Sequence, residues 1–308
     1  MLKRIVLSII IVVLYYSSAL SQDIRIIVKL NEEIITNLDI NFEKKYLIFL
    51  NENLKQLDQK DLDIIAKNSL IREKIKEKEI KNFFDLKQNY EFEDKLLADF
   101  YKRRKFKNKE ELLDYLKNKK ISFNKIKKKL KIETLWNQVI YNKFHKNIKI
   151  DNEYLKNQII EKNKNKKKNY DYNLSEILFE VDGDEKNKLK KIKKSIDKIG
   201  FKNTANKLSI SETSNFGGEI GWVKGSQLSE NIEKKIYNIS IGEISDPIKT
   251  SNGYLILKIN DKKEIKKKLN LDSELKLLIN YEKNRQLNQF SIIYYKRLKQ
   301  NTNIDEFK

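Results

Sequence analysis

The sequence contains no cysteine, one histidine and one proline, and only eight glycines in 308 residues. Without cysteine the fold cannot rely on disulfides, and a chain of this length does not need them. One histidine and no cysteine give no basis for a metal site, so we expect neither a metal nor another cofactor. The proline and all the glycines lie between Gly183 and Gly253, which confines the turn-forming backbone to one segment.

The amino terminus has the three-part order of a secretory signal. A positive start at residues 1–4 precedes an uncharged apolar stretch at 5–16, which is too short to span a bilayer comfortably. Small residues follow, with Ala19 and Ser21 in the positions that favour cleavage after Ser21. We therefore predict a signal peptide over residues 1–21 and a periplasmic protein. The alternative is an uncleaved signal that anchors the chain in the membrane.

The composition is strongly basic, with 65 Lys and Arg against 44 Asp and Glu and a formal net charge of +21. The lysines run through expected helices and loops alike, which indicates a general compositional bias. The densest run, KNKNKKK at residues 162–168, is interpreted as a solvated linker, so we expect no nucleic-acid partner. The overall field favours contact with acidic chains or anionic lipid surfaces at low salt.

Hydrophobic spacing divides the mature chain into three parts. Residues 22–168 combine a short hairpin with several helices and are predicted to form an N-terminal helical domain. The glycine-containing segment, residues 170–262, alternates strands with helices and closes with a hairpin at Asn252 and Gly253, which predicts a small α+β domain. From residue 265 to residue 308 the pattern is again helical. Because a lone amphipathic helix would expose its apolar stripe, we expect it to pack on the N-terminal helices.

Four blocks of the middle segment resemble a parvulin-type (PpiC-like) peptidyl-prolyl isomerase domain in order and spacing. They are LSEILF at residues 174–179, GGEIGW at 217–222, IGEISDPI at 241–248 and NGYLILK at 252–258. The flanks at 27–40 and 281–298 are similar to SurA-type periplasmic chaperones. The resemblance implies an α+β protein in which a mainly helical SurA-like chaperone domain carries one inserted parvulin-like domain, although family members often carry two.

The polar site that the resemblance implies is incomplete. Active parvulins carry one histidine in the first strand and one in the last, with a cysteine or aspartate between them. Glu176 and Leu255 stand at the two histidine positions, and the intervening loop offers Ser211 at best. The single histidine, His145, lies in the helical region. The catalytic residues therefore stay unassigned, with Glu176, Ser211 and Tyr254 as weak candidates.

The apolar side of the family pocket is better preserved. Trp222, Leu228 and Ile232 occupy positions that resemble the wall holding the substrate proline, so they are the predicted substrate-binding residues. The competing interpretation is that they form the core of a small domain, which needs most of its large apolar side chains.

These features predict a periplasmic holdase for unfolded outer-membrane or secreted polypeptides, with a parvulin-like domain of weak or absent isomerase activity. Extended clients would lie between the two domains. The alternative is an active peptidyl-prolyl isomerase with an atypical histidine-free site, so whether the chain is an enzyme stays open at this point. A third possibility is a membrane-tethered folding factor. Transient contact with the membrane or with outer-membrane assembly machinery completes the expected partners.

Overall fold

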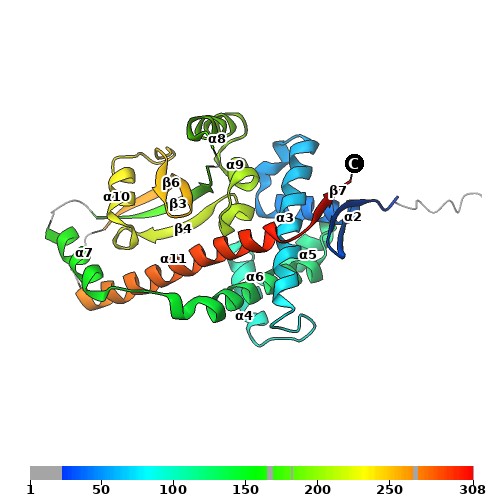
Figure 1. Cartoon of the computed structure of the whole chain (residues 1–308), viewed down its shortest axis with the longest axis horizontal. Helices are drawn as coiled ribbons and strands as arrows, with labels where there is room; N and C mark the ends of the chain where they lie inside the picture. Colours follow the sequence, from blue (N-terminus) through cyan, green and yellow to red (C-terminus); the bar gives the residue numbers. More distant parts are fainter. Residues whose placement is uncertain (1–22, 165–168, 182, 266–269, 308) are drawn as a thin grey trace, which may run out of the picture.

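The computed structural model describes residues 23–164, 169–181, 183–265 and 270–307. The predicted signal peptide, residues 1–21, lies outside the described residues, as do residues 165–168 of the basic run. Figure 1 shows two parts. A helical body is built from both ends of the chain, and a module based on a four-stranded sheet is inserted between them.

The helical body contains most of the helices. They are α2 (Asn37–Leu50), α3 (Gln59–Ile80), α4 (Phe92–Arg103), α5 (Lys109–Asn118), α6 (Phe123–Phe144), α7 (Asn152–Lys164) and α11 (Leu271–Gln300), with 3₁₀ turns η1 (Glu52–Gln56) and η2 (His145–Asn147). A small antiparallel sheet in the order β2-β1-β7 completes it. Its strands are β1 (Ile26–Leu30), β2 (Glu33–Thr36) and β7 (Ile304–Glu306).

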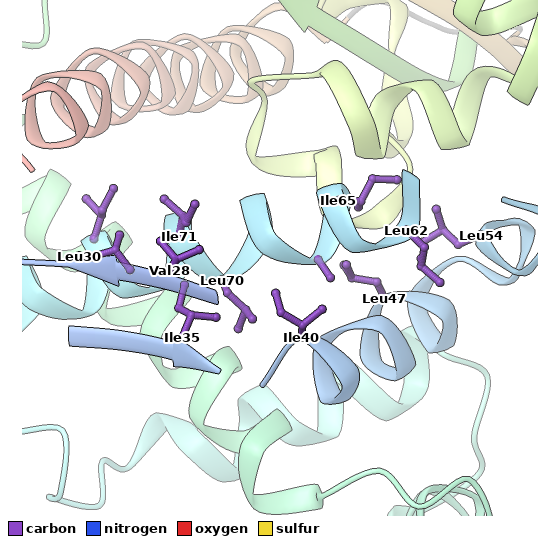
Figure 2. Packing of buried hydrophobic residues seen from close by; sticks show 12 residues of the cluster. Val28, Leu30, Ile35, Ile40, Leu47, Leu54, Leu62, Ile65, Leu70 and Ile71 are labelled. Carbon is purple, nitrogen blue, oxygen red and sulfur yellow. The ribbon is translucent and has the colours of Figure 1, made fainter. Parts of the chain in front are cut away.

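Local sequence signals set the first helix of the body. Thr36 caps α2 in a capping box, because its hydroxyl accepts from the Asp39 N–H while the Asp39 carboxylate accepts from the Thr36 N–H. The apolar faces of β1, β2, α2 and α3 then bury one continuous cluster that includes Val28, Leu47 and Leu62 (Figure 2). The hairpin therefore sits on the two helices that follow it.

The carboxy-terminal helix α11 packs back on the helical body. Trp136 of α6 is fully buried, its indole N–H donates to the Ser291 hydroxyl of α11 at 2.8 Å, and its ring stacks on Tyr294. At its start, α11 buries Leu278 against Leu155 of α7. These contacts confirm the predicted fold class, including the return of the last helix to the N-terminal helices.

The sheet module spans residues 169–265. Its strands are β3 (Asn169–Phe179), β4 (Glu219–Lys224), β5 (Ile248–Thr250) and β6 (Gly253–Ile265), all antiparallel in the order β4-β3-β6-β5. Its helices are α8 (Glu185–Ile199), α9 (Phe201–Leu208) and α10 (Glu230–Ile236), with 3₁₀ turns η3 (Glu212–Phe216) and η4 (Gly225–Gln227).

The two faces of this sheet are covered by different elements. Ile177, Phe179 and Ile256 pack against α8 and α9, and we call this side the α8 face. Leu178 and Leu257 point the other way, into a cluster that also takes in α10 and Ile292 of α11. We call this side the α11 face, because α11 runs beside it in Figure 1. Within the described ranges, no helix combines the length and the apolar character needed to cross a bilayer.

Candidate functional site

The two positions expected for histidines lie on the α11 face of the sheet. Glu176 of β3 pairs with Leu257 of β6, and Leu178 pairs with Leu255. Because side chains alternate along a strand, Glu176 and Leu255 project to the same side. Leu255 is buried in the apolar cluster and can neither donate nor accept a proton. Glu176 is thus the one titratable side chain at the two histidine positions.

Two hydroxyl groups hold the Glu176 carboxylate. Its Oε1 accepts from the Ser211 Oγ at 2.5 Å and from the Thr213 Oγ1 at 3.0 Å. Burial raises the pKa of Glu176, and the two hydrogen bonds oppose that rise. Ser211 is itself buried, so the structure brings two of the three catalytic candidates together in an enclosed cluster. Thr213 was not among the predicted site residues. The sequence feature that could have indicated it is a second hydroxyl side chain two residues after Ser211.

Tyr254 is not part of this cluster. It pairs with Phe179 across β3 and β6, and the two rings stack at a centroid distance of 6.1 Å on the α8 face. A hydrogen bond to Glu185 raises the pKa of its phenol. Strand alternation therefore places Tyr254 on the opposite side of the sheet from Glu176 and Ser211.

The predicted substrate wall is also divided. Leu228 is buried and Ile232 is partly buried in the apolar cluster of the α11 face. Trp222 projects to the opposite side of β4, because its neighbour Val223 points into that cluster and side chains alternate along a strand. Trp222 is 51% exposed, with the Lys263 ammonium 5.7 Å from the centroid of its ring. The structure does not bring the three side chains together, and Leu228 packs as core.

Helix α11 covers the face on which the candidate cluster lies. Burial and the nearby Glu176 charge raise the pKa of Tyr281 on α11. Further along the helix, Gln289 donates to the Ser251 hydroxyl at 2.6 Å, and the Lys296 ammonium meets Glu180 at 3.0 Å. These contacts hold α11 along the sheet module over much of its length.

Helix α3 of the helical body grips the loop that carries Ser211. The Arg72 guanidinium donates to the Ser211 carbonyl at 3.2 Å and to the Ser214 hydroxyl at 2.7 Å. Lys76, whose side chain is fully buried, lies between Glu212 at 2.6 Å and Glu133 at 2.7 Å. Removing either carboxylate would leave a buried charge short of a partner. The loop is therefore fixed by the helical body as well as by its own module.

Residues 176–261 match the family model described as the PPIC-type PPIase domain, or Rotamase. This segment is a PPIC-type rotamase domain. We use that name below for the sheet module.

Two curated relatives extend the similarity beyond the rotamase domain. Foldase protein PrsA 2 of Bacillus cereus is 32% identical over 117 residues, which cover 37% of this chain and 40% of the relative. Chaperone SurA of Pseudomonas putida is 27% identical over 154 residues, which cover 46% of this chain and 36% of the relative. The chain therefore matches well under half the length of either protein.

A solved structure of one of two SurA-like chaperones of Campylobacter jejuni aligns with 92% of this chain and 99% of its own. Its identity is 18% and its TM-score 0.38. The resemblance to a SurA-type chaperone with one PPIC-type domain is confirmed by the domain match and the sequence relatives.

The glycine pair of the rotamase domain has a geometric reason. Gly218 has a φ of +78°, and a Cβ atom there would lie 2.1 Å from the Glu176 carbonyl oxygen. The Glu176 N–H in turn donates to the Gly218 carbonyl at 2.8 Å. Only glycine fits this close approach, so the GGEIGW block requires glycine at position 218.

A cavity of about 380 Å³ lies where the rotamase domain meets the helical body. It is lined by α3, by the segment from α9 to η3, and by the end of α11. Apolar side chains such as Ile71, Leu208 and Ile292 share its wall with the cations Arg72 and Lys299. This volume is within the usual range for ligand pockets, so the junction has room for side chains of a bound chain.

No metal centre is apparent in the part of the chain that the structure describes, where no three His, Cys, Asp or Glu side chains gather suitably. His145 is exposed at the end of α6, with its Nδ1 2.9 Å from the Tyr141 carbonyl and its ring stacked on Tyr141. The contacts of His145 are thus confined to the end of α6, away from Glu176 and Ser211.

Proposed function

We propose that this protein is a periplasmic holdase for unfolded outer-membrane or secreted polypeptides, and that its rotamase domain has weak or no isomerase activity. The observation that carries the proposal is the state of the two histidine positions. Leu255 is buried in the apolar core, and Glu176 is enclosed by two hydroxyls on a face that α11 covers.

The chemistry of prolyl isomerisation supports this view. The amide must pass through a twisted state about 18–20 kcal/mol above the ground state. A catalyst must bind that state more tightly than the planar amide, and it must first reach the substrate. The Glu176 carboxylate already accepts two hydrogen bonds within the fold, and Leu255 offers none. Neither position supplies the imidazole that active parvulins place there.

The names of the relatives support a folding role. They are a foldase and a chaperone, and the Campylobacter jejuni structure is described as that of a SurA-like chaperone. A secretory signal at residues 1–21 would place the protein among newly exported chains. Such chains expose apolar side chains and unpaired strand edges, which are the groups that aggregate.

The junction cavity is the proposed contact for part of a client. Its wall combines apolar side chains with the exposed Lys299 ammonium, which has no carboxylate partner among the described residues, and this suits segments that carry apolar and acidic residues together. Binding of this kind collects many weak apolar contacts, and the positive charge strengthens it when the client is acidic.

A protease-coupled assay on a proline-containing peptide, run with residues 22–308, tests the catalytic part. We expect a rate indistinguishable from the uncatalysed reaction. Clear turnover that is lost in Ser211→Ala and in Ile232→Glu would favour the alternative, an active isomerase with a histidine-free site. Matched circular dichroism spectra for the two variants would exclude unfolding as the cause of the loss.

Suppression of the aggregation of a denatured acidic protein tests the holdase part. We expect the full-length mature protein to suppress aggregation near equimolar amounts. Lys299→Glu at the cavity rim should weaken suppression several-fold, because it reverses the charge that an acidic client meets. Arg297→Glu, on the same helix but outside the cavity lining, is the matched control and should act like the wild type. Failure of the wild type to suppress aggregation would refute the proposal.

A further inference from the structure

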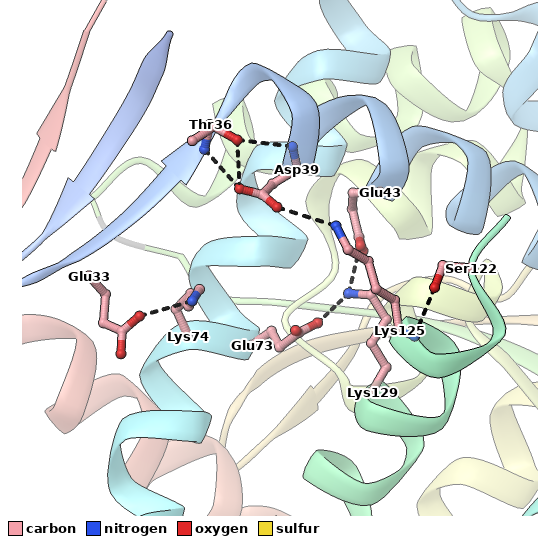
Figure 3. A network of polar contacts seen from close by, with 9 residues as sticks. All are labelled: Glu33, Thr36, Asp39, Glu43, Glu73, Lys74, Ser122, Lys125 and Lys129. Atoms are coloured by element: carbon pink, nitrogen blue, oxygen red, sulfur yellow. Dashed lines mark hydrogen bonds and ion pairs between the residues drawn. The ribbon is translucent and has the colours of Figure 1, made fainter. Parts of the chain in front are cut away.

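Helix α6 of the helical body is rich in lysine, and every one of its lysines is ion-paired. The pairs are Lys125 with Asp39, Lys127 and Lys131 with Glu93, Lys128 with Glu77, Lys129 with Glu43 and Glu73, and Lys143 with Glu79. The carboxylates come from α2, α3 and α4, which surround α6, and Figure 3 shows the pairs of Lys125 and Lys129. The lysines of α6 thus join it to its neighbours.

Helix α8 of the rotamase domain carries as much lysine but uses it differently. Its seven lysines are all exposed, and within the described ranges none of them contacts a carboxylate or an aromatic ring. They are Lys186, Lys188, Lys190, Lys191, Lys193, Lys194 and Lys198. The two acidic residues of the helix, Glu185 and Asp197, lie near its ends, and Glu185 bonds to Tyr254.

Four of these lysines form a ridge that is inclined to the helix axis. Lys186, Lys190, Lys194 and Lys198 follow one another at four-residue intervals, so each lies next to the one before it on the helix surface. Like charges at this spacing destabilise a helix, whereas lysine and glutamate at the same spacing stabilise it. A general lysine bias explains the abundance on both helices. It does not explain why the lysines of α6 are paired while those of α8 stand at four-residue intervals without opposing carboxylates among the described residues.

The opposite side of α8 is already occupied. Ile192 is 1% exposed, and Leu189 and Ile196 pack with it on the α8 face of the sheet. In Figure 1 this helix lies at the edge of the molecule, on the other side of the sheet from α11. A partner therefore meets a convex row of ammonium groups, with no apolar patch and no groove on the helix itself.

We propose that this lysine ridge docks the protein on a membrane surface through anionic lipid headgroups. A planar array of negative charge can meet all four ammonium groups at once. A polypeptide needs a groove, a sheet edge or an apolar anchor for comparable binding, and the ridge provides none of these. Because the apolar side faces the sheet, α8 lies on the headgroups without entering the hydrocarbon.

Co-sedimentation of the mature protein with lipid vesicles tests this proposal. We expect binding to vesicles of equimolar phosphatidylcholine and phosphatidylglycerol, and no binding to pure phosphatidylcholine. Each lysine near an anionic surface strengthens binding by about fivefold at moderate salt. Replacing Lys186, Lys190, Lys194 and Lys198 by glutamine should therefore weaken binding at least about tenfold. Raising the salt from about 0.05 M to about 0.5 M should release the wild type.

The matched control removes the same charge elsewhere. Lys95, Lys102, Lys107 and Lys117 of the α4–α5 region are exposed and have no carboxylate partner among the described residues, so their glutamine variant has the same net charge. We expect it to bind within about twofold of the wild type.

Equal loss of vesicle binding in both variants would show that net charge alone causes the effect, and it would overturn the proposal. Binding to polyglutamate but not to anionic vesicles would overturn it in favour of an acidic polypeptide. Aggregation assays on the same two variants test the holdase proposal separately from lipid binding.

Discussion

The six lysines of α6 each reach a carboxylate on a neighbouring helix, whereas the seven lysines of α8 face solvent without one. Both helices are rich in lysine and carry an apolar side. The difference is that α6 is enclosed by α2, α3 and α4, while α8 touches its domain with one face only. The same residue type therefore holds the interior together in one region and leaves a charged surface in the other.

The largest expected effect comes from removing a paired lysine of α6. Lys129 is nearly buried between Glu43, at 2.6 Å, and Glu73. Lys129→Ala leaves the fully buried Glu43 carboxylate without its cation, and breaking such a pair costs about 3–5 kcal/mol in the free energy of unfolding. Urea denaturation monitored by circular dichroism measures this loss. The matched change Lys191→Ala on α8 should alter stability by less than about 0.5 kcal/mol. Similar losses in the two variants would remove the contrast between the helices.

A smaller effect is expected at Glu176, where a charge is buried with hydroxyl partners and no cation. Its pKa is raised in the fold, so the stability of the native state falls as the pH rises from the unfolded-state pKa towards the native pKa, and it stays lower above that. Glu176→Gln keeps an oxygen that can accept from Ser211 and Thr213. We expect it to be more stable than the wild type at pH 8 and equal to it near pH 4.

Denaturation curves at several pH values test the Glu176 prediction. Glu219→Gln is the control, because Glu219 is an exposed residue of the adjacent strand β4 and should change stability little at any pH. A stability gain for Glu176→Gln that stays constant from pH 4 to pH 8 would show that the charge is not its cause.

The smallest effect should appear on α8 itself. Lys190→Glu places an acid between Lys186 and Lys194, and so converts two repulsive pairs into attractive ones. The expected gain is about 0.5–1 kcal/mol at low salt, and it should vanish near 1 M salt, where the screening length falls to about 3 Å. Lys190→Gln should gain about half as much. Thermal melts at the two salt concentrations measure both, and a salt-independent gain would contradict the repulsion.

Local signals in the sequence predicted much of the fold. Thr36 or Asn37 is a suitable cap for the first helix and Ser122 for a later one, and the structure places Thr36 and Ser122 as the N-caps of α2 and α6. Glycine is the residue that most often ends a helix, and Gly200 follows α8 with a φ of +80°. These features depend on a few neighbouring residues, so the sequence order contains the necessary information.

Features that depend on distant segments were harder to predict. The family resemblance assigned Glu176 and Ser211 to the same candidate site, and the structure joins them by a hydrogen bond. The sequence could not show that the α3 side chain Arg72 binds the Ser211 loop, or that α11 packs on the face of the sheet that carries Glu176, because these contacts join residues far apart in the chain. Tyr254 does not join this site, because its neighbour Leu255 projects to the α11 face of β6 and Tyr254 therefore projects to the α8 face.

The pairing of β7 with β1 gives the chain an order of assembly. Leu30 lies opposite Ile304, and Val28 opposite Glu306, so β1 acquires its second neighbour from residues that are made much later in translation. A contact across this span cannot form before both segments have left the ribosome. The hairpin of β1 and β2 therefore keeps one edge open until β7 emerges and closes it.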